Sequence, residues 1–174
     1  MKILLTGARG FIGSYFQKNY ALNYQCKTFS LSSDKLVELI LDDVEVIIHL
    51  AAVVHQPYAR KEEYVHVNVQ KTLELAQKAK EYGVKQFIFI SSIAVYDSSL
   101  TLLKEDSLLN PSTLYGQSKL EAENKLLALE DESFKVAIIR PPMVYGANAP
   151  GKIRSLTKLV DKIPILPFGN IDNK

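Results

Sequence analysis

Short apolar runs rich in β-branched and aromatic residues alternate along this chain with longer segments whose apolar residues recur at helical spacing. The apolar runs cover residues 2–6, 26–30, 45–50, 86–91 and 134–140. Helical patterns fill the intervals between them, and such alternation is typical of strand–helix–strand units with a parallel sheet. The pattern therefore predicts an α/β fold, a doubly wound parallel sheet with helices on both faces.

Four helices are predicted between these strands. They cover residues 11–22, 34–41 and 60–82, and a fourth segment that opens at Asn110-Pro111 and continues to residue 127. Gly83 is expected to end the third helix, and Pro111 to lie in the first turn of the fourth, where its missing N–H does no harm. In a sheet of this kind, the ligand site lies at the carboxyl ends of the strands.

Glycines at positions 7, 10 and 13 directly follow the first apolar run. In a strand that turns tightly into a helix, Gly7 would permit the turn and Gly10 would let the backbone approach a pyrophosphate. Gly13 would let the helix pack closely on the strand. On spacing alone, an ordinary glycine turn is an equal alternative to a nucleotide site. Together with the strand pattern, the turn favours a Rossmann-like domain.

Tyr115 and Lys119 lie four residues apart, on one face of the fourth predicted helix. A phenol has an ordinary pKa near 10, and an ammonium about 4 Å away would lower this pKa by roughly 3 units. Tyr115 could then remove a proton from a hydroxyl, or return one to a carbonyl, while hydride moves to or from a nicotinamide. The alternative is a solvated pair on the helix surface.

At this point the residues match a known family. The chain resembles the extended short-chain dehydrogenase/reductases, in their nucleotide-sugar epimerase, dehydratase and reductase branch. The motifs that carry the resemblance are the glycines at 7, 10 and 13, His49-Leu50-Ala51-Ala52, Ser91-Ser92-x-x-Val95-Tyr96, Tyr115-x-x-x-Lys119 and Arg140-Pro141-Pro142-Met143-Val144-Tyr145-Gly146.

The resemblance implies roles for individual residues. Tyr115 is expected to be the acid and base, Lys119 to lower the pKa of Tyr115 and hold the cofactor ribose, and Ser92 to hydrogen-bond the reacting oxygen. Ser92 is preferred to Ser91 because the family's hydroxyl residue lies four positions before the turn tyrosine, here Tyr96. The residues expected to bind the cofactor are Gly7, Arg9, Gly10, Phe11, Ile12, Gly13, Ser30, Ser32, Leu50, Ala51, Ala52, Tyr115, Lys119 and Pro141.

The end of the second strand bears on the choice between NAD and NADP. Many NAD-using relatives have an acidic residue there, whereas this chain has Ser30-Leu31-Ser32. Without that carboxylate a 2′-phosphate is not repelled, and Arg9 could pair with it as a charge-assisted fork. NADP is therefore favoured over NAD, with a solvent-facing Arg9 as the alternative.

Epimerisation and keto-sugar reduction, acting on a nucleotide-diphosphate sugar, are the leading reactions implied by the resemblance. Dehydration is disfavoured, because relatives that dehydrate have an Asp-Glu pair where this chain has Ile93-Ala94. A non-catalytic NAD(P)-binding sensor or interaction module is the alternative function. Residues 1–174 are expected to form an NAD(P)-binding domain that lacks the family's C-terminal substrate-binding half.

Composition narrows the remaining possibilities. The net charge is +2 with interspersed signs, and no apolar stretch is long enough to span a bilayer, so neither nucleic acid nor membrane is an expected partner. A single cysteine, Cys26, and the unclustered His49, His55 and His66 argue against a metal site. A cytoplasmic location is expected, and the family suggests a homodimer formed through the 60–82 and 110–130 helices.

Overall fold

The computed structural model describes residues 1–54, 60–146, 149, 155 and 158–160. The chain divides into two compact units, Met1–Pro142 and Met143–Lys174. The first unit contains the sheet and its helices, and in the second the described residues 155 and 158–160 are helical. No helix in these described ranges is long and apolar enough to cross a membrane.

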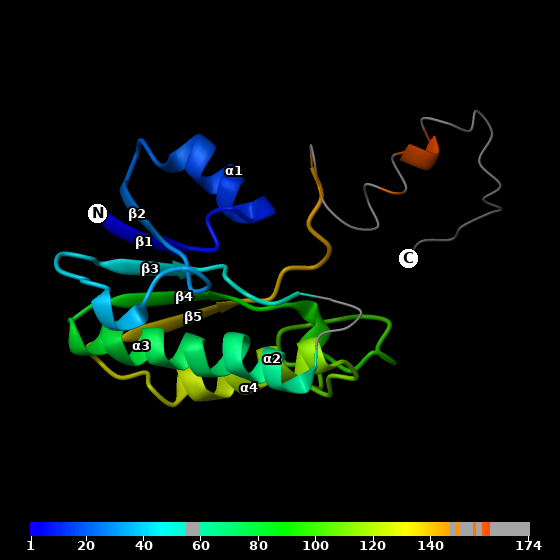
Figure 1. Cartoon of the computed structure of the whole chain (residues 1–174). Helices are drawn as coiled ribbons and strands as arrows, with labels where there is room; N and C mark the ends of the chain where they lie inside the picture. The colour runs from blue at the N-terminus through cyan, green and yellow to red at the C-terminus, as the bar shows by residue number, and fades with distance from the viewer. Residues whose placement is uncertain (55–59, 147–148, 150–154, 156–157, 161–174) are drawn as a thin grey trace. The chain divides into compact units, whose positions relative to one another are not determined.

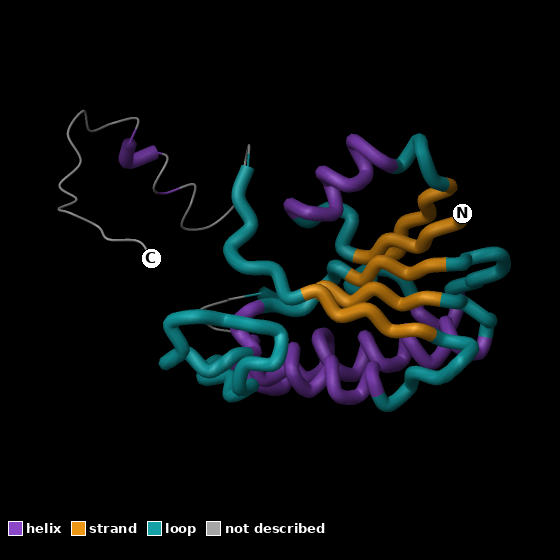
Figure 2. Tube along the Cα trace, turned by 180° about the vertical axis from the view of Figure 1, so that it is seen from behind, coloured by secondary structure: helices purple, strands orange, loops and turns teal. Residues whose placement is uncertain are grey.

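Five parallel strands form the sheet of the first unit, in the order β2-β1-β3-β4-β5 (Figures 1 and 2). They are β1 (Lys2–Thr6), β2 (Gln25–Phe29), β3 (Val46–His49), β4 (Gln86–Ile90) and β5 (Lys135–Ile139). Each strand ends within one residue of its predicted range. The chain runs from β1 outward to β2 and then returns to β3 on the other side of β1, so β1 and β3 flank the topological switch point.

Helices cover both faces of the sheet, as predicted. Helix α1 (Phe11–Tyr20) lies on one face, and α3 (Lys71–Glu81) and α4 (Leu114–Leu127) lie side by side on the other (Figure 1). Alternate strand residues face α3 and α4, and these include the fully buried Phe87 and Phe89 of β4. The core therefore lies mainly between the sheet and these two helices.

The predicted 60–82 helix is a continuous helical segment with an irregular centre. It begins as α2 (Lys61–Tyr64), passes through a π-helical segment η2 (Val65–Gln70) and continues as α3. Gly83 ends it at φ +75°, as predicted. The N–H of Gly83 donates to Lys80 O and that of Val84 to Ala79 O, each at 3.0 Å, which is the Schellman arrangement.

The helix predicted over 34–41 is absent from the structure, which contains only the 3-10 turn η1 (Leu36–Glu38). The backbone is extended on both sides of this turn, at Lys35 and Leu39. Asp34 does not cap a helix, because its carboxylate accepts the N–H of Ser30 at 2.8 Å. The prediction was wrong because a short local turn satisfies these backbone groups instead.

Helix α4 begins later than predicted, at Leu114. Thr113 is its N-cap and accepts the N–H of Gly116 at 3.0 Å through Oγ1. Pro111 therefore lies in the preceding segment and not in the first helical turn. The stronger signal for the start of α4 was the capping threonine.

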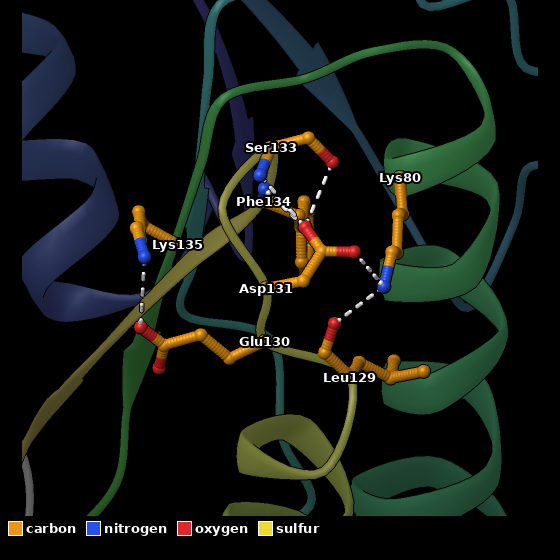
Figure 3. A network of polar contacts seen from close by, with 7 residues as sticks. All are labelled: Lys80, Leu129, Glu130, Asp131, Ser133, Phe134 and Lys135. Carbon is orange, nitrogen blue, oxygen red and sulfur yellow. Dashed lines mark hydrogen bonds and ion pairs between the residues drawn. The ribbon is translucent and has the colours of Figure 1, made fainter.

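A polar network closes the connection from α4 to β5 at the amino ends of the strands (Figure 3). Asp131 Oδ1 accepts the backbone N–H groups of Ser133 at 2.8 Å and Phe134 at 3.0 Å. Asp131 Oδ2 pairs with Lys80 of α3 at 2.7 Å, and Lys80 also donates to Leu129 O at 2.7 Å. These hydrogen bonds and the ion pair hold the pKa of Asp131 well below its ordinary value.

Candidate active site

The turn between β1 and α1 has two glycines that the packing requires. Gly7 adopts φ +67°, and a Cβ there would lie 2.7 Å from Ala51 N in the segment after β3. A Cβ at Gly13 would lie 2.3 Å from Gly7 O. Both distances are shorter than real side-chain contacts, so these glycines hold α1 against the sheet.

Gly10 differs from these two glycines, because neither its φ nor its packing requires a glycine as strongly. It is exposed and adopts φ −72°, and a Cβ there would approach Gly7 O at 3.1 Å. It is the N-cap of α1, and no side chain caps that helix. The first-turn N–H groups, at Phe11, Ile12 and Gly13, have no partner within a helix. A bare, uncapped helix N-terminus at the carboxyl end of β1 fits the pyrophosphate of a dinucleotide.

The loop after β3 is held in place by buried polar groups. Thr6 Oγ1 accepts the N–H of Ala51 at 3.3 Å, and Leu50, Ala51 and Ala52 are half-buried beside the glycine turn. Asn68 of η2 accepts the N–H of Val53 at 2.8 Å and donates to Val53 O at 3.0 Å. The small side chains therefore border the same edge as the turn.

Asn68 also connects this loop to α4. Its Nδ2 donates to Ser118 Oγ at 3.0 Å, and Ser118 donates to Tyr115 O at 2.8 Å. Asn68 lies within the π-helical segment, and such segments occur frequently at functional sites. The sequence pattern gave no signal for the link between Asn68 and the helix of Tyr115.

Arg9 lies over the end of β2, where Arg9 Nη2 donates to Ser30 Oγ at 3.2 Å. Ser30 Oγ in turn lies 3.0 Å from Ser32 Oγ. Asp34, which the sequence analysis missed, is at this end of the strand as well. The hydrogen bonds from Ser30 N–H and Ser33 Oγ, with the charge of Arg9, hold the pKa of Asp34 below its ordinary value. Strand β2 is followed by Ser30-Leu31-Ser32 and not by an acidic residue, as the sequence indicated, but the carboxylate of Asp34 lies close to Arg9.

Ser92 and Tyr115 are brought together from different elements. Ser92 precedes the 3-10 turn η3 (Ile93–Val95), and its Oγ accepts the N–H of Ala94 at 3.1 Å. Helix α4 approaches this turn closely, since a Cβ at Gly116, next to Tyr115, would lie 2.2 Å from Ala94 O. Tyr64 of α2 meets the Tyr115 ring edge-on, with ring centroids 6.5 Å apart. Burial raises the pKa of Tyr115, and the Ser92 hydrogen bond opposes that effect.

Lys119 is 2% exposed and points toward β4. Its Nζ donates to Ile90 O at 2.8 Å and lies 4.4 Å from the centroid of the Phe89 ring. Burial lowers the pKa of Lys119 to about 7, while nearby Glu123 opposes the shift. The expected lowering of the Tyr115 pKa by Lys119 is not found in this structure, because burial dominates both groups.

Two further residues complete this edge. Ser91 donates its backbone N–H to Ile139 O at 2.7 Å, and its buried Oγ has no hydrogen-bond partner within the described ranges. Pro141 is half-buried, and its carbonyl accepts the N–H of Ile93 at 3.3 Å. Within the described part of the chain, no three His, Cys, Asp or Glu side chains form a group suited to a metal ion, and His55 lies outside that part.

The fold and the glycine turn define a dinucleotide-binding α/β domain. The family model of the NAD-dependent epimerase/dehydratase family matches residues 26–174, and the chain belongs to this family. A UDP-glucose 4-epimerase from Vibrio cholerae is 36% identical to it, covering 97% of this chain and 60% of that protein. The chain thus spans less than two thirds of that relative.

Solved structures of similar proteins agree with the fold. The structure of MoeE5 in complex with UDP-glucose and NAD has 28% sequence identity and a TM-score of 0.77, covering 92% of this chain and 60% of that one. The structure of RMD from Pseudomonas aeruginosa with NADPH has 26% identity and a TM-score of 0.69, covering 81% and 52%. The solved structures that resemble this chain therefore include a complex with NAD and a complex with NADPH.

Proposed function

We propose that this chain is the cofactor-binding half of a nucleotide-sugar epimerase or keto-sugar reductase in which Tyr115 exchanges the proton. The observation that carries the proposal is the close approach of α4 to η3 at Gly116 and Ala94, which places Tyr115 beside the turn that follows Ser92. It lies at the same edge of the sheet as the glycine turn, with buried Lys119 one helical turn further along α4. This arrangement joins a proton-exchanging hydroxyl to a helix N-terminus suited to a dinucleotide.

Each side chain has a defined part in this proposal. A bound NAD(P) would supply the chemistry of accepting or returning hydride. To oxidise a sugar hydroxyl, Tyr115 must accept its proton as a phenolate, and to reduce a keto carbon it must donate that proton. Ser92 orients the Tyr115 hydroxyl and favours the phenolate. Lys119, when protonated, adds a positive charge one helical turn away, but burial outweighs it and keeps the pKa of Tyr115 raised.

The cofactor preference is part of the same proposal. Arg9, Ser30 and Ser32 together present a guanidinium and two hydroxyls at the end of β2, the chemistry that binds a 2′-phosphate. The carboxylate of Asp34 opposes this preference, because its negative charge is close to Arg9 and repels a phosphate. We favour NADP over NAD on the strength of the direct contact between Arg9 and Ser30.

The proposed substrate is a nucleotide-diphosphate sugar, and the proposed assembly is a homodimer formed through the 60–82 and 110–130 helices, in the cytoplasm. Support for the substrate comes from the relative named as a UDP-glucose 4-epimerase and from MoeE5, which was solved with UDP-glucose. Leu114 and Leu127 of α4 and Tyr82 after α3 are 40–47% exposed, and they offer apolar surface for such a dimer.

The experiment is turnover by the full-length protein and its Tyr115→Phe variant, with UDP-glucose and with a dTDP-4-keto sugar as substrates. We expect Tyr115→Phe to bind NAD(P) as the parent does and to lose at least about 100-fold in kcat. Ser92→Ala should lose less, because it removes the orienting group only. Undiminished turnover by Tyr115→Phe would contradict the proposal. A parent that binds cofactor but turns over neither substrate would favour a sensor or interaction module.

A further inference from the structure

Arg140 connects three segments at the carboxyl end of β5. Its Nε donates to Glu123 Oε1 at 3.1 Å, and its Nη2 donates to Glu123 Oε2 at 2.7 Å, a bidentate pair with α4. Its Nη1 donates to the hydroxyl of Tyr96 at 2.8 Å and to Glu105 O at 3.4 Å. The guanidinium carbon also lies 5.0 Å from the centroid of the Tyr96 ring. One guanidinium thus binds the helix of Tyr115 and the turn that follows Ser92.

The turn and the helix already touch on their other side. A Cβ at Gly116 would lie 2.2 Å from Ala94 O, so α4 approaches η3 as closely as backbone allows. Tyr96 follows η3 directly, and its N–H donates to Ile93 O at 3.1 Å. Ser92 and Tyr115 therefore belong to two backbone segments held together at Gly116 and, further along, by Arg140.

Glu123 places the guanidinium relative to the reacting groups. Tyr115, Lys119 and Glu123 are spaced four residues apart along α4 and so lie on one face of the helix. Glu123 is 1% exposed, and a buried carboxylate needs a charged partner, which Arg140 supplies. The same carboxylate favours the protonated form of Lys119.

We propose that Arg140 is a positioning residue for the Ser92–Tyr115 pair, because its planar fork fixes the turn after Ser92 to the helix of Tyr115. The inference rests on the proposed function, and it assigns Arg140 no contact with substrate. A planar, bidentate group suits this task better than an ammonium, because it fixes direction as well as distance. Loss of this constraint should lower kcat, since small misplacements of reacting groups cost up to about 100-fold in rate.

Two sets of full-length variants separate positioning from stability. Tyr96→Phe keeps the ring and the Arg140–Glu123 pair and removes the hydroxyl that joins the turn. Arg140→Met combined with Glu123→Met removes the buried carboxylate together with its half-buried guanidinium partner, a replacement that is often neutral for stability. The matched control is Lys135→Met with Glu130→Met, which removes an exposed pair at the opposite end of β5, with N and O atoms 3.8 Å apart (Figure 3).

The measurements are the Tm, the cofactor Kd, KM and kcat of each variant. We expect the double variant to keep its cofactor Kd within about twofold and to lose about 10- to 100-fold in kcat with little change in KM. Tyr96→Phe should fold like the parent and lose about 3- to 10-fold in kcat, and the control should match the parent. Arg140→Lys should be nearly as slow as the double variant, because it keeps the charge and loses the fork.

Parental kcat in both Tyr96→Phe and the double variant would overturn the inference, as would full rescue by Arg140→Lys. If the double variant does not fold, Tyr96→Phe decides, since it keeps the ion pair. Tyr115→Phe is measured alongside. Full turnover by that variant would refute the proposed function and the inference with it, whereas an inactive Tyr115→Phe beside a fully active double variant would refute the inference alone.

Discussion

His49 Nε2 lies 2.9 Å from Thr72 Oγ1, and this contact joins the end of β3 to α3 inside the core. The other ring nitrogen, Nδ1, lies 2.9 Å from Thr6 Oγ1 of β1. His49 is fully buried and stacks on Phe89, with ring centroids 5.8 Å apart. Burial, with the charge of Lys119, lowers the pKa of His49 to about 3. The native protein therefore keeps this imidazole neutral throughout the pH range of ordinary use.

Stability should fall with acidity because of His49. Between pH 6.5 and 3 the unfolded chain holds a proton on this imidazole that the native state lacks, so unfolding is favoured as the pH falls. We expect His49 to account for about 2 kcal/mol of lost stability between pH 7 and 5. Urea unfolding at both pH values tests this, with His49→Gln expected to lose that dependence. Exposed His66→Gln is the control, and an equal slope in all three proteins would contradict the prediction.

Substitutions at two glycines of the β1–α1 turn should have different effects, one on NAD(P) binding and the other on stability. Gly10→Ala should lower the Tm by only about 2 °C, because a Cβ there would lie 3.1 Å from Gly7 O, a tight contact that a shift of a few tenths of an ångström relieves. It should weaken NAD(P) binding at least about tenfold, because the methyl group enters the space proposed for the pyrophosphate. Gly13→Ala should instead lose about 1–3 kcal/mol of stability, because its Cβ would collide with backbone. Calorimetric titration and thermal unfolding test both, and parental affinity in Gly10→Ala would contradict the first expectation.

Arg9 and Asp34 should act on the cofactor 2′-phosphate in opposite directions. Arg9→Gln should weaken NADP(H) binding about tenfold or more and leave NAD(H) binding unchanged, since only the former has a phosphate to pair with the guanidinium. Asp34→Asn should strengthen NADP(H) binding by up to about fivefold, because it removes an exposed negative charge close to Arg9. Titrations of both variants with both cofactors at low and high salt test this. Equal loss of NAD(H) and NADP(H) in Arg9→Gln would show that Arg9 does not read the phosphate.

The buried Lys119 should lower the free energy of unfolding of the native protein. Its pKa falls from 10.5 to about 7 on folding, so below pH 7 the native state must carry a buried charge that the unfolded chain holds in water. Lys119→Met should therefore be more stable than the parent by about 0.5–2 kcal/mol at pH 7. The gain should shrink as the pH rises toward 10, because the unfolded lysine then gives up its own proton.

The test of Lys119 is urea unfolding of both proteins from pH 6 to 10, with exposed Lys125→Met as the control. Lys119→Met should also lose turnover, so its stability should rise while its activity falls. A Lys119→Met protein less stable than the parent at pH 7 would show that the bond to Ile90 O and the Phe89 contact outweigh the burial of the charge.

The sequence predicted the sheet well because each strand is marked locally. The runs that end at Thr6, His49 and Ile90 are rich in apolar, β-branched or aromatic residues, and small residues follow each of them within two positions. The glycine turn was also visible, since the need for Gly7 and Gly13 is set by residues close in sequence or by the paired strand. The roles of Ser92 and Tyr115 followed from the family resemblance and stay predictions, while the structure brings their two segments together at Gly116 and Ala94.

The sequence could not predict what depends on distant neighbours. The direction of Lys119 follows from the carbonyl of Ile90 and the ring of Phe89, which lie on another element. Asp34 looked like the start of a helix, whereas its carboxylate binds Ser30 at the end of β2. Arg140 was part of a recognisable motif, yet its pairing with Glu123 became visible only in three dimensions.

The π-helical segment Val65–Gln70 makes the spacing of residues along this helix intolerant of length changes. Each residue turns a regular helix by about 100°, so removing one residue here to restore regular α-helical geometry would rotate the two halves against each other by that amount. If Asn68 then kept its contacts with Val53 and Ser118, Leu75 and Ala76 would leave the core. If Leu75 and Ala76 stayed in the core, Asn68 would lose those contacts. Natural variation in this helix should therefore consist of substitutions, with single-residue deletions and insertions excluded between Tyr64 and Lys71.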